Sequence, residues 1–335
     1  MKKRILVTGG AGFIGSNLLL HLHEKYPEAH FLNIDKLSYA SDLSYLDPIK
    51  GSNRYTFKKL DIVDRKAVRD IIRSYKPEGV FHLAAESHVD NSIKGPEPFI
   101  KSNVLGTFNL LEECRQFWKE DEGRWQNNRF LHVSTDEVYG ELGEQGAFSE
   151  DSPYAPNSPY SASKAGSDFV VRSYFHTYGM NVVTTNCSNN FGPHQHDEKL
   201  IPTVIRTALN KNNIPVYGKG ENVRDWLYVT DHCEAMDLVF REGTTGETYI
   251  VGGNNEWKNI DLVKKICDIL NEEVGEGPES DYKSLITFVT DRPGHDFRYA
   301  IDASKIKEEL GWKSQESFEE RLRETIQWYV KRYNK

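Results

Sequence analysis

The sequence has few cysteines, and they show no pairing pattern. Four cysteines occur in 335 residues, and even the closest two, Cys233 and Cys267, are 34 positions apart. The CxxC spacing typical of zinc sites is therefore absent, and so is the dense spacing of a disulfide-stabilised small domain. We expect reduced thiols, no metal site and a cytoplasmic location.

A long apolar run and an excess of positive charge are also missing. No stretch of about 18 apolar residues occurs, and the opening residues, MKKRILVTGG, pass directly from basic residues into a strand-like run. We therefore expect neither a signal peptide nor a membrane segment. The 42 Lys and Arg residues are outnumbered by 50 Asp and Glu residues, which gives a formal net charge of −8. This balance argues against a nucleic-acid partner, but it allows a local basic pocket for a small anion.

What the first half does contain is a regular alternation of short apolar runs and helical patterns. Such alternation is typical of an α/β fold with a doubly wound parallel sheet. We expect strands over residues 5–7, 30–35, 55–61, 79–84, 129–135 and 181–186, and helices over residues 12–26, 65–75, 97–118 and 161–178.

The second half is less regular. After Asn190, Pro and Gly cluster in FGPHQ, IPVYGKG and DRPGH, and the predicted elements become shorter. We expect residues 1–190 to form the doubly wound domain and residues 191–335 to form mainly a smaller, mixed α/β lobe that binds substrate. Residues 225–250 are expected to return to the first domain.

A glycine-rich turn follows the first predicted strand and begins the first predicted helix. In its GxxGxxG spacing, Gly9 allows a tight turn, Gly12 lets the backbone approach a pyrophosphate, and Gly15 lets helix and strand pack closely. Asp35 ends the second strand, where its carboxylate can accept hydrogen bonds from ribose hydroxyls and repel a 2′-phosphate. The pattern predicts a Rossmann domain that binds NAD rather than NADP, with Lys36 as the discordant residue.

Two further strand ends supply candidate cofactor residues. Asp61 and Ile62 follow the third strand, where an adenine edge would lie, although Asp61 fits a helix N-cap equally well. Leu83, Ala84 and Ala85 follow the fourth strand, and their small side chains let the backbone pass close beneath a cofactor.

Tyr160 and Lys164 form a YxxxK pair on the helix that follows the fifth strand. Positions i and i+4 share a helix face, so the phenol and the ammonium can point into one site. We expect Lys164 to lower the pKa of Tyr160, so that the phenolate takes a proton from an alcohol during hydride transfer. Such a pair is often only a solvated helix face, but its place in a dinucleotide-binding sheet favours catalysis.

Two adjacent carboxyl groups, Asp136 and Glu137, follow Thr135 at the end of the fifth strand. The chain turns there, so both side chains can reach a substrate. Two carboxyls in one cleft separate in pKa, which leaves one as acid and the other as base. Elimination of water needs such a pair, whereas a solvated acidic turn is the alternative interpretation.

Through the motifs TGGAGFIG, HLAAESHVD, YSASK, NNFGP and RDWLYVTD, the chain resembles the extended short-chain dehydrogenase/reductase family over nearly its whole length. The resemblance implies NAD in the Rossmann domain, a nucleotide sugar in the C-terminal lobe, and a homodimer formed through the helices after the fourth and fifth strands. The Thr135-Asp136-Glu137 triplet resembles that of the family branch that dehydrates dTDP-glucose.

That resemblance implies a role for each catalytic residue. Tyr160 takes the proton of the sugar 4-hydroxyl while NAD accepts hydride from C4, and Thr135 holds the resulting ketone oxygen. Glu137 removes the C5 proton, and Asp136 protonates the departing C6 hydroxyl. Hydride then returns to C6 and NAD is restored. The expected product is dTDP-4-keto-6-deoxyglucose, a precursor of rhamnose-type deoxysugars.

The resemblance also completes the predicted site. The predicted catalytic residues are Thr135, Asp136, Glu137, Tyr160 and Lys164. The predicted cofactor residues are Gly9, Gly12, Phe13, Ile14, Gly15, Asp35, Lys36, Leu37, Ser38, Asp61, Ile62, Leu83, Ala84, Ala85, Ser102, Tyr160, Lys164 and Asn190. The predicted substrate residues are Ser87, Thr135, Asn189, Lys199, Leu200, Pro215, Tyr217, Arg224, Asn259, Arg292 and His295.

Two other functions stay open at this point. An epimerase or decarboxylase of the same family would bind a similar substrate, but epimerases lack the acid pair and decarboxylases usually have Thr-Ser-Glu at this place. A non-catalytic NAD(H)-sensing regulator could use the same scaffold, since fold does not fix function. A sensor would need neither the acid pair nor the YxxxK pair.

Overall fold

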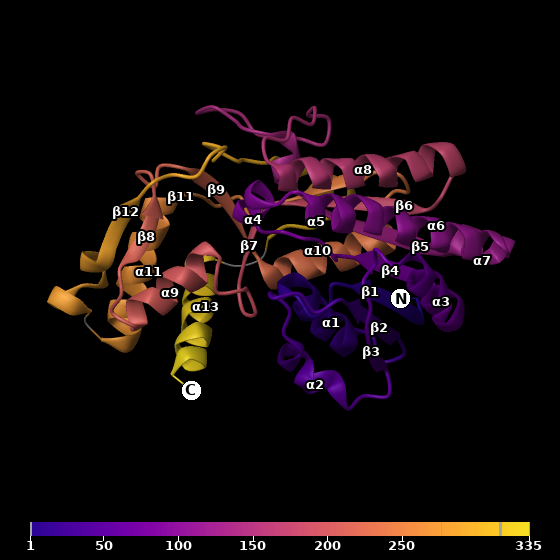
Figure 1. Ribbon diagram of the computed structural model, residues 1–335, viewed down its shortest axis with the longest axis horizontal. Helices are drawn as coiled ribbons and strands as arrows, with labels where there is room; N and C mark the ends of the chain where they lie inside the picture. Colours follow the sequence, from indigo (N-terminus) through magenta and orange to yellow (C-terminus); the bar gives the residue numbers. More distant parts are fainter. Residues whose placement is uncertain (1, 276, 315–316, 335) are drawn as a thin grey trace.

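The computed structural model describes residues 2–275, 277–314 and 317–334, and its centre is a seven-stranded parallel sheet (Figure 1). The strand order is β10-β6-β5-β4-β1-β2-β3. These strands are β1 (Arg4–Thr8), β2 (His30–Asp35), β3 (Tyr55–Lys59), β4 (Gly79–His82), β5 (Arg129–Thr135), β6 (Val182–Cys187) and β10 (Thr248–Val251). Helices cover both faces, so the predicted doubly wound fold is confirmed.

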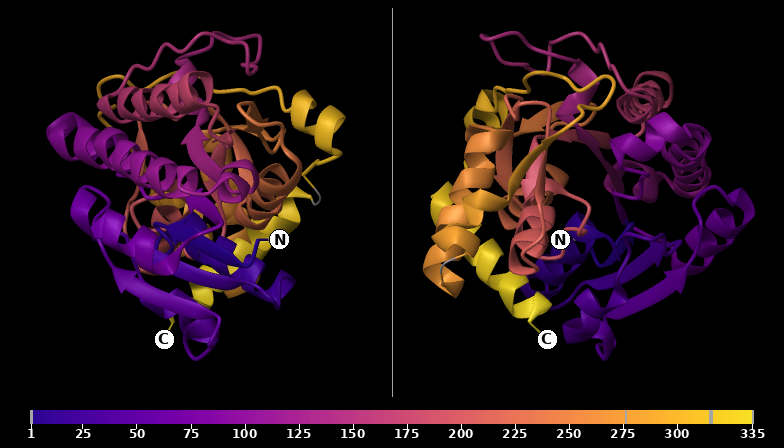
Figure 2. Two further views of the ribbon diagram at one scale, coloured as in Figure 1. Left: turned by 90° about the vertical axis from the view of Figure 1, so that its right-hand side faces the viewer. Right: turned by 60° about the vertical axis from the view of Figure 1, so that its left-hand side comes forward.

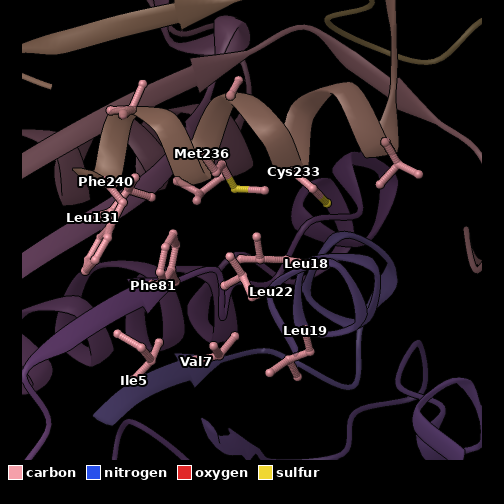
Figure 3. Packing of buried hydrophobic residues seen from close by; sticks show 14 of the residues in the cluster. Ile5, Val7, Leu18, Leu19, Leu22, Phe81, Leu131, Cys233, Met236 and Phe240 are labelled. Carbon is pink, nitrogen blue, oxygen red and sulfur yellow. The ribbon is translucent and has the colours of Figure 1, made fainter. Parts of the chain in front are cut away.

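Side chains of β1 show how the apolar sequence builds two layers of core. Ile5 and Val7 point to the face covered by α1 (Phe13–Lys25) and α10 (Val229–Glu242), and Leu6 points to the opposite face. That second face is covered by α3 (Arg65–Tyr75), α6 (Gly106–Lys119) and α8 (Pro159–Tyr178). Figure 3 shows the first layer, with side chains from α1 and α10 directed towards Ile5, Val7 and Phe81. Because successive side chains of a strand alternate between faces, a continuous apolar run suits a strand buried on both.

The smaller lobe has its own sheets and core. It contains a three-stranded sheet in the order β11-β9-β7 and a two-stranded sheet of β12 and β8. The first sheet is mixed, because β9 pairs antiparallel with β11 and parallel with β7. The strands are β7 (Asn189–Phe191), β8 (Ile214–Tyr217), β9 (Val223–Tyr228), β11 (Glu256–Lys258) and β12 (Ile286–Val289), and the packing helices are α9 (Leu200–Leu209), α11 (Asn259–Val274) and α13 (Phe318–Tyr333). Figure 1 places this lobe beside the carboxyl ends of the central strands.

The chain crosses between the two parts more than once. Although β9 lies in the small sheet, α10 packs on α1, and β10 pairs with β6 at the edge of the large sheet. The remaining short helices are α2 (Asp47–Lys50), α4 (Val89–Lys94), α5 (Glu97–Phe99), α7 (Glu122–Asn127) and α12 (Ser304–Leu310). No helix in the described part of the chain is long and apolar enough to cross a membrane.

One predicted helix, over residues 97–118, is interrupted. The structure has α5, then a π-helical segment over Ile100–Leu105, and then α6. Within the segment, the Asn103 side chain bonds to both backbone groups of Glu86, at 2.8 and 3.0 Å, and donates to the Ser163 hydroxyl at 2.8 Å. A π turn changes the direction of side chains locally and is frequent at functional sites. Sequence periodicity did not reveal it, since the partners of Asn103 are remote in sequence.

The close packing of α1 on the glycine turn leads to a first prediction. A Cβ added at Gly15 would lie 2.2 Å from the Gly9 carbonyl oxygen, whereas one at Gly51 would meet nothing within 4 Å. Alanine favours a helix over glycine by about 1 kcal/mol, but a backbone clash costs more. We expect Gly15→Ala to lower Tm by about 4 °C or more and Gly51→Ala to leave it almost unchanged. Equal Tm values for the two variants in calorimetry would show that this contact is not tight.

Candidate active site

A cavity of about 360 Å³ lies where the large sheet meets the smaller lobe, at the carboxyl ends of its strands. Ligands of doubly wound sheets bind at this edge. Every predicted cofactor residue except Leu37 lines the cavity. The predicted substrate residues that line it are Ser87, Thr135, Asn189, Lys199 and Leu200. The structure thus brings residues from both halves of the chain to one site.

The glycine turn has the geometry that a dinucleotide requires. Gly9 has φ +71°, a left-handed conformation that glycine adopts readily, and its amide donates to the Ile34 carbonyl at 2.9 Å. A Cβ added at Gly12 would meet only the Gly9 carbonyl oxygen, at 3.3 Å, so the backbone there is open to the cavity. The turn and the start of α1 therefore fit a pyrophosphate, because the first turn of a helix leaves backbone amides without intrahelical partners and residues 12–15 line the cavity.

Asp35 holds the segments around this turn as well as lining the cavity. Its carboxylate accepts hydrogen bonds from the backbone amides of Ala11, at 3.0 Å, and Leu37, at 2.8 Å. The Ser41 hydroxyl donates to it at 3.1 Å. Leu37 lies outside the cavity lining and has φ +59°. Its contribution in the structure is this backbone amide.

The discordant Lys36 has a partner that the sequence did not indicate. Its ammonium forms an ion pair with Glu86 at 2.5 Å and contacts the Ser102 hydroxyl at 3.4 Å. The positive charge beside Asp35 is thereby neutralised. A second ambiguity is also resolved, because α3 begins with Asp64 as its N-cap, and Asp61 instead accepts from the Val63 amide while lining the cavity.

The first turn of α8 fixes the position of Tyr160. Ser158 accepts from the Ser161 amide at 3.0 Å, and the Ser161 hydroxyl accepts from the Ser158 amide at 3.0 Å, which forms a capping box. Tyr160 and Lys164 then follow on one helix face, and both line the cavity. The Lys164 ammonium donates to the Val133 carbonyl at 2.7 Å, which attaches α8 to β5.

The surroundings of Tyr160 oppose the low pKa that the sequence predicts for it. Burial and the Glu137 carboxylate raise the pKa of Tyr160 well above its usual value, although a hydrogen bond from Thr135 opposes them. Burial also lowers the pKa of Lys164. The prediction considered the spacing of two charges alone, whereas the desolvation of both groups depends on tertiary packing.

The acid pair occupies a tight turn between β5 and the segment that leads to α8. Thr135 ends β5, and its hydroxyl accepts from the Glu137 amide at 3.3 Å, which starts a short 3-10 helix over Asp136–Tyr139. Asp136 is buried, with 1% of its surface exposed, and it does not line the cavity, so the expectation that both carboxyls reach it holds only for Glu137. Glu137 is half-buried and lines the cavity. The turn therefore gives the two neighbouring carboxyls different surroundings.

These surroundings separate the two carboxyls electrostatically. Burial and the Glu137 and Asp225 carboxylates raise the pKa of Asp136 well above its usual value, and one of its oxygens has no hydrogen-bond partner. Burial also raises the pKa of Glu137, but the cations Arg292, Arg224 and Lys199 oppose this effect. The pKa of both carboxyls is therefore raised, but three cations make Glu137 the more easily ionised of the two, so Asp136 is the candidate acid and Glu137 the candidate base. Among the described residues, no cluster of three or more His, Cys, Asp or Glu side chains could hold a metal ion.

The other predicted substrate residues lie outside the cavity lining. Arg292 pairs with Asp90 at 3.0 Å, and the Tyr217 hydroxyl donates to the same carboxylate at 3.2 Å. His295 contacts Asp291 at 2.7 Å and meets the Tyr217 ring edge-on, with 6.2 Å between centroids. These residues therefore form one cluster around Asp90.

Arg224, predicted to bind substrate, is bonded to backbone groups of the protein instead of lining the cavity. Its guanidinium donates to the backbone carbonyls of Val223, Phe297 and Asp296 at 2.7, 3.3 and 2.8 Å. It also lies over the Tyr299 ring, 4.2 Å from the centroid. Pro215 is exposed on β8, and Asn259 is the first residue of α11, with a buried side-chain oxygen that has no partner.

Several residues of the site were not found from the sequence. The cavity is also lined by Ile34, Ala40, Ser41, Leu60, Val133, Ser134, Cys187, Ser188, Gln195, His196, Glu198 and Trp226. Asp90 was missed although it binds two predicted residues. Asp90 ends the motif HLAAESHVD and lies on α4, but its partners are more than 120 positions away.

Comparisons with known proteins agree with this arrangement. Residues 6–325 match the family model described as GDP-mannose 4,6 dehydratase. A probable dTDP-glucose 4,6-dehydratase of Sinorhizobium fredii is 54% identical over 98% of this chain and 93% of its own length. The dTDP-glucose 4,6-dehydratase 1 of Escherichia coli is 51% identical over 98% of this chain and 92% of its own length.

Solved structures give the same result. The dTDP-glucose 4,6-dehydratase of Bacillus anthracis in complex with NAD has a TM-score of 0.88 and 42% identity, over 99% of this chain and 98% of its own. The Streptomyces venezuelae dTDP-glucose 4,6-dehydratase DesIV, solved with NAD and TYD bound, has a TM-score of 0.89 and 42% identity over the same shares. A UDP-glucose 4-epimerase of Thermotoga maritima has a TM-score of 0.86 but only 27% identity, over 98% of this chain and 99% of its own. The chain therefore belongs to the extended short-chain dehydrogenase/reductase family, and within it to the dTDP-glucose 4,6-dehydratases.

Proposed function

We propose that this protein converts dTDP-glucose into dTDP-4-keto-6-deoxyglucose and water, a step towards deoxysugars. The observation that carries the proposal is the pair of neighbouring carboxyls in one turn, with Asp136 buried and Glu137 lining the cavity together with Tyr160. Dehydration needs an acid for the departing hydroxyl and a base for the carbon. Epimerisation of a sugar has no step that needs both. Relatives about half identical over nearly the whole chain bear the name of this activity.

The cofactor of the reaction is NAD. Gly9, Gly12 and Gly15 would hold its pyrophosphate at the start of α1, and Asp35 would accept hydrogen bonds from its adenosine ribose. Asp61 and Ile62 would lie at the adenine edge. When bound, NAD supplies the hydride acceptor for the sugar C4 and the hydride donor for C6.

The residues of this chain then provide the proton transfers. Tyr160 takes the proton of the 4-hydroxyl as a phenolate. Burial opposes this form, whereas the cationic Lys164 one helical turn away and the positive charge of a bound nicotinamide ring would favour it. The Thr135 hydroxyl, which bonds to Tyr160, holds the oxygen at C4. A ketone at C4 acidifies the C5 hydrogen, because negative charge at C5 spreads onto that oxygen.

The acid pair performs the elimination itself. Glu137 removes the C5 proton, and Asp136 gives its proton to the C6 hydroxyl, which leaves as water. After C6 is reduced, Glu137 returns its proton to C5. Tyr160 has gained one proton and Asp136 has lost one, so a single transfer between them through solvent restores the resting state.

Each part of the chain has its own task in this proposal. Residues 1–190, together with the segment that returns to the large sheet, bind NAD and carry the acid–base groups. Residues 191–335 mainly bind the nucleotide sugar. Lys199, Arg224 and Arg292 place positive charge around Glu137, as a diphosphate substrate requires within an acidic chain.

The proposal also includes the homodimer and the cytoplasmic location expected from the sequence. Ile100 and Leu105 on the π-helical segment are 50% and 42% exposed, and Phe169 on α8 is 58% exposed. The segment packs against α8, and Figure 2 shows α8 beside the helices before α6. Exposed apolar side chains on two adjoining helices are typical of an interface.

That interface can be tested by light scattering. We expect the purified protein to have twice the mass of one chain, and Phe169→Glu to yield monomers because a buried charge is costly at an interface. Phe288→Glu, at an equally exposed side chain on β12, is the matched control and should stay dimeric. A monomeric unmodified protein would contradict the dimer proposal.

Isotope transfer tests the function directly. With dTDP-glucose deuterated at C4 and no added NAD, we expect the label at C6 of the product, together with loss of water. Mass spectrometry and NMR of the product make this measurement. Label that stays at C4, or that leaves as free reduced cofactor, would refute the dehydratase proposal.

Substitution of the acid pair separates its two roles. We expect Glu137→Gln to slow product formation by about 10²–10⁴-fold and to abolish exchange of the C5 hydrogen with D₂O, because the base is lost. Asp136→Asn should slow product formation similarly yet keep C5 exchange, because only the acid is lost. Glu144→Gln, in an exposed loop, is the control. If the exchange results are reversed between the two variants, the assignment of base and acid is wrong.

A further inference from the structure

Asp168 continues the face of α8 that carries the YxxxK pair. Tyr160, Lys164 and Asp168 follow one another at intervals of four positions, so all three share one helix face. It is 5% exposed and does not line the cavity. An ionised carboxylate is costly to bury without partners, so its contacts are informative.

Four side chains bond to this carboxylate, the most distant being the Asn186 amide, which donates to it at 3.5 Å. His132 lies 2.9 Å from one oxygen through Nε2, and the Ser134 hydroxyl donates to the other at 2.8 Å. The Tyr154 hydroxyl donates to that second oxygen at 3.0 Å. His132 and Ser134 belong to β5, and Tyr154 belongs to the loop before α8. One carboxylate therefore joins the catalytic strand, the catalytic helix and the loop between them.

These contacts continue to the acid turn. Ser134 directly precedes Thr135, so the Asp168 contact fixes the end of β5 where the turn begins. Tyr154 meets the Tyr139 ring edge-on, with 5.1 Å between centroids, at the end of the turn. Asn186 on β6 donates to the Thr135 carbonyl at 3.2 Å. Both ends of the turn are thus held through groups that contact Asp168.

The charges around Lys164 give Asp168 a second effect. On β4 and β5, burial lowers the pKa of His82 and His132, which keeps both rings neutral. On β6, burial raises the pKa of the Cys187 thiol to about 12. Asp168 is the carboxylate that opposes the effect of burial on the Lys164 pKa.

We propose that Asp168 is a positioning residue of the reaction, which fixes β5 and α8 relative to each other and keeps Lys164 cationic beside Tyr160. The carboxylate touches neither cavity nor reacting atoms and acts through its partners. This role rests on the proposed dehydratase function. It assigns a task to a buried charge that the acid–base steps do not use.

Asp168→Asn keeps the shape of the side chain and removes its charge. We expect kcat to fall about tenfold or more, while KM and the amount of copurified NAD change less than threefold. The pH above which kcat falls should be lower by about one unit or more, because Lys164 then loses its proton more easily. Asp168→Glu should partly restore the pH at which kcat falls, because it keeps the negative charge.

Two controls separate this effect from a loss of stability. Asp237 is also buried and pairs with Lys25 at 2.9 Å, but it lies on α10 at the far side of the sheet. Asp237→Asn should lower Tm without moving the pH profile. If Asp168→Asn behaves like Asp237→Asn, or keeps full kcat, the proposal is overturned. Unmodified protein that fails to transfer the C4 label would instead overturn the dehydratase function.

Tyr154→Phe tests the positioning part without removing a charge, and it can be used if Asp168→Asn does not fold. It deletes one hydrogen bond to Asp168 from a side chain that does not line the cavity. We expect kcat to fall at least threefold with an unchanged pH profile and an unchanged NAD content. Unchanged kcat in this variant would contradict the positioning role.

Discussion

The unequal burial of two neighbouring carboxyls is the constraint on which the chemistry of this protein depends. Asp136 is buried with one oxygen unpartnered, and the carboxylates of Glu137 and Asp225 add to the effect of burial in raising its pKa. Glu137, one residue later, faces the cavity and three cations. Identical surroundings would give both acids the same role, whereas these surroundings make Glu137 the more easily ionised of the two. The Thr135 hydroxyl donates to one Asp136 oxygen at 3.2 Å, and the other, unpartnered oxygen disfavours the charged form.

Several elements of the fold set the different surroundings of Asp136 and Glu137. The parallel sheet ends β5 at the edge where the cofactor turn of β1 and α1 also lies, so oxidation and elimination share one cavity. Thr135 starts the turn, and the capping box of α8 sets Tyr160 opposite it. The smaller lobe contributes Lys199 and the arginines that favour the ionised form of Glu137. A UDP-glucose 4-epimerase shares this fold at 27% identity, so the architecture alone does not determine the reaction.

The sequence predicted what depends on local pattern. Apolar runs located strands along the chain, as in β2 and β5, and glycine spacing located the turn at Gly9. Features that depend on remote partners were missed. The π-helical segment follows from contacts of Asn103 with Glu86 and Ser163, and the pKa of Tyr160 follows from burial. Asp90 was not expected to bind Tyr217 and Arg292, because pairing across lobes leaves no periodic signal. The roles assigned to individual site residues remain predictions.

A neutral Asp136 beside an ionised Glu137 is the central claim, and infrared difference spectroscopy tests it most directly. The spectrum of the protein at neutral pH minus that of Asp136→Asn should contain the carbonyl band of a protonated carboxylic acid, which shifts in D₂O. The corresponding difference for Glu137→Gln should contain carboxylate bands only. If removal of Asp136 takes away carboxylate bands and no acid band, both groups are ionised at rest, and the separation of acid from base described above is contradicted.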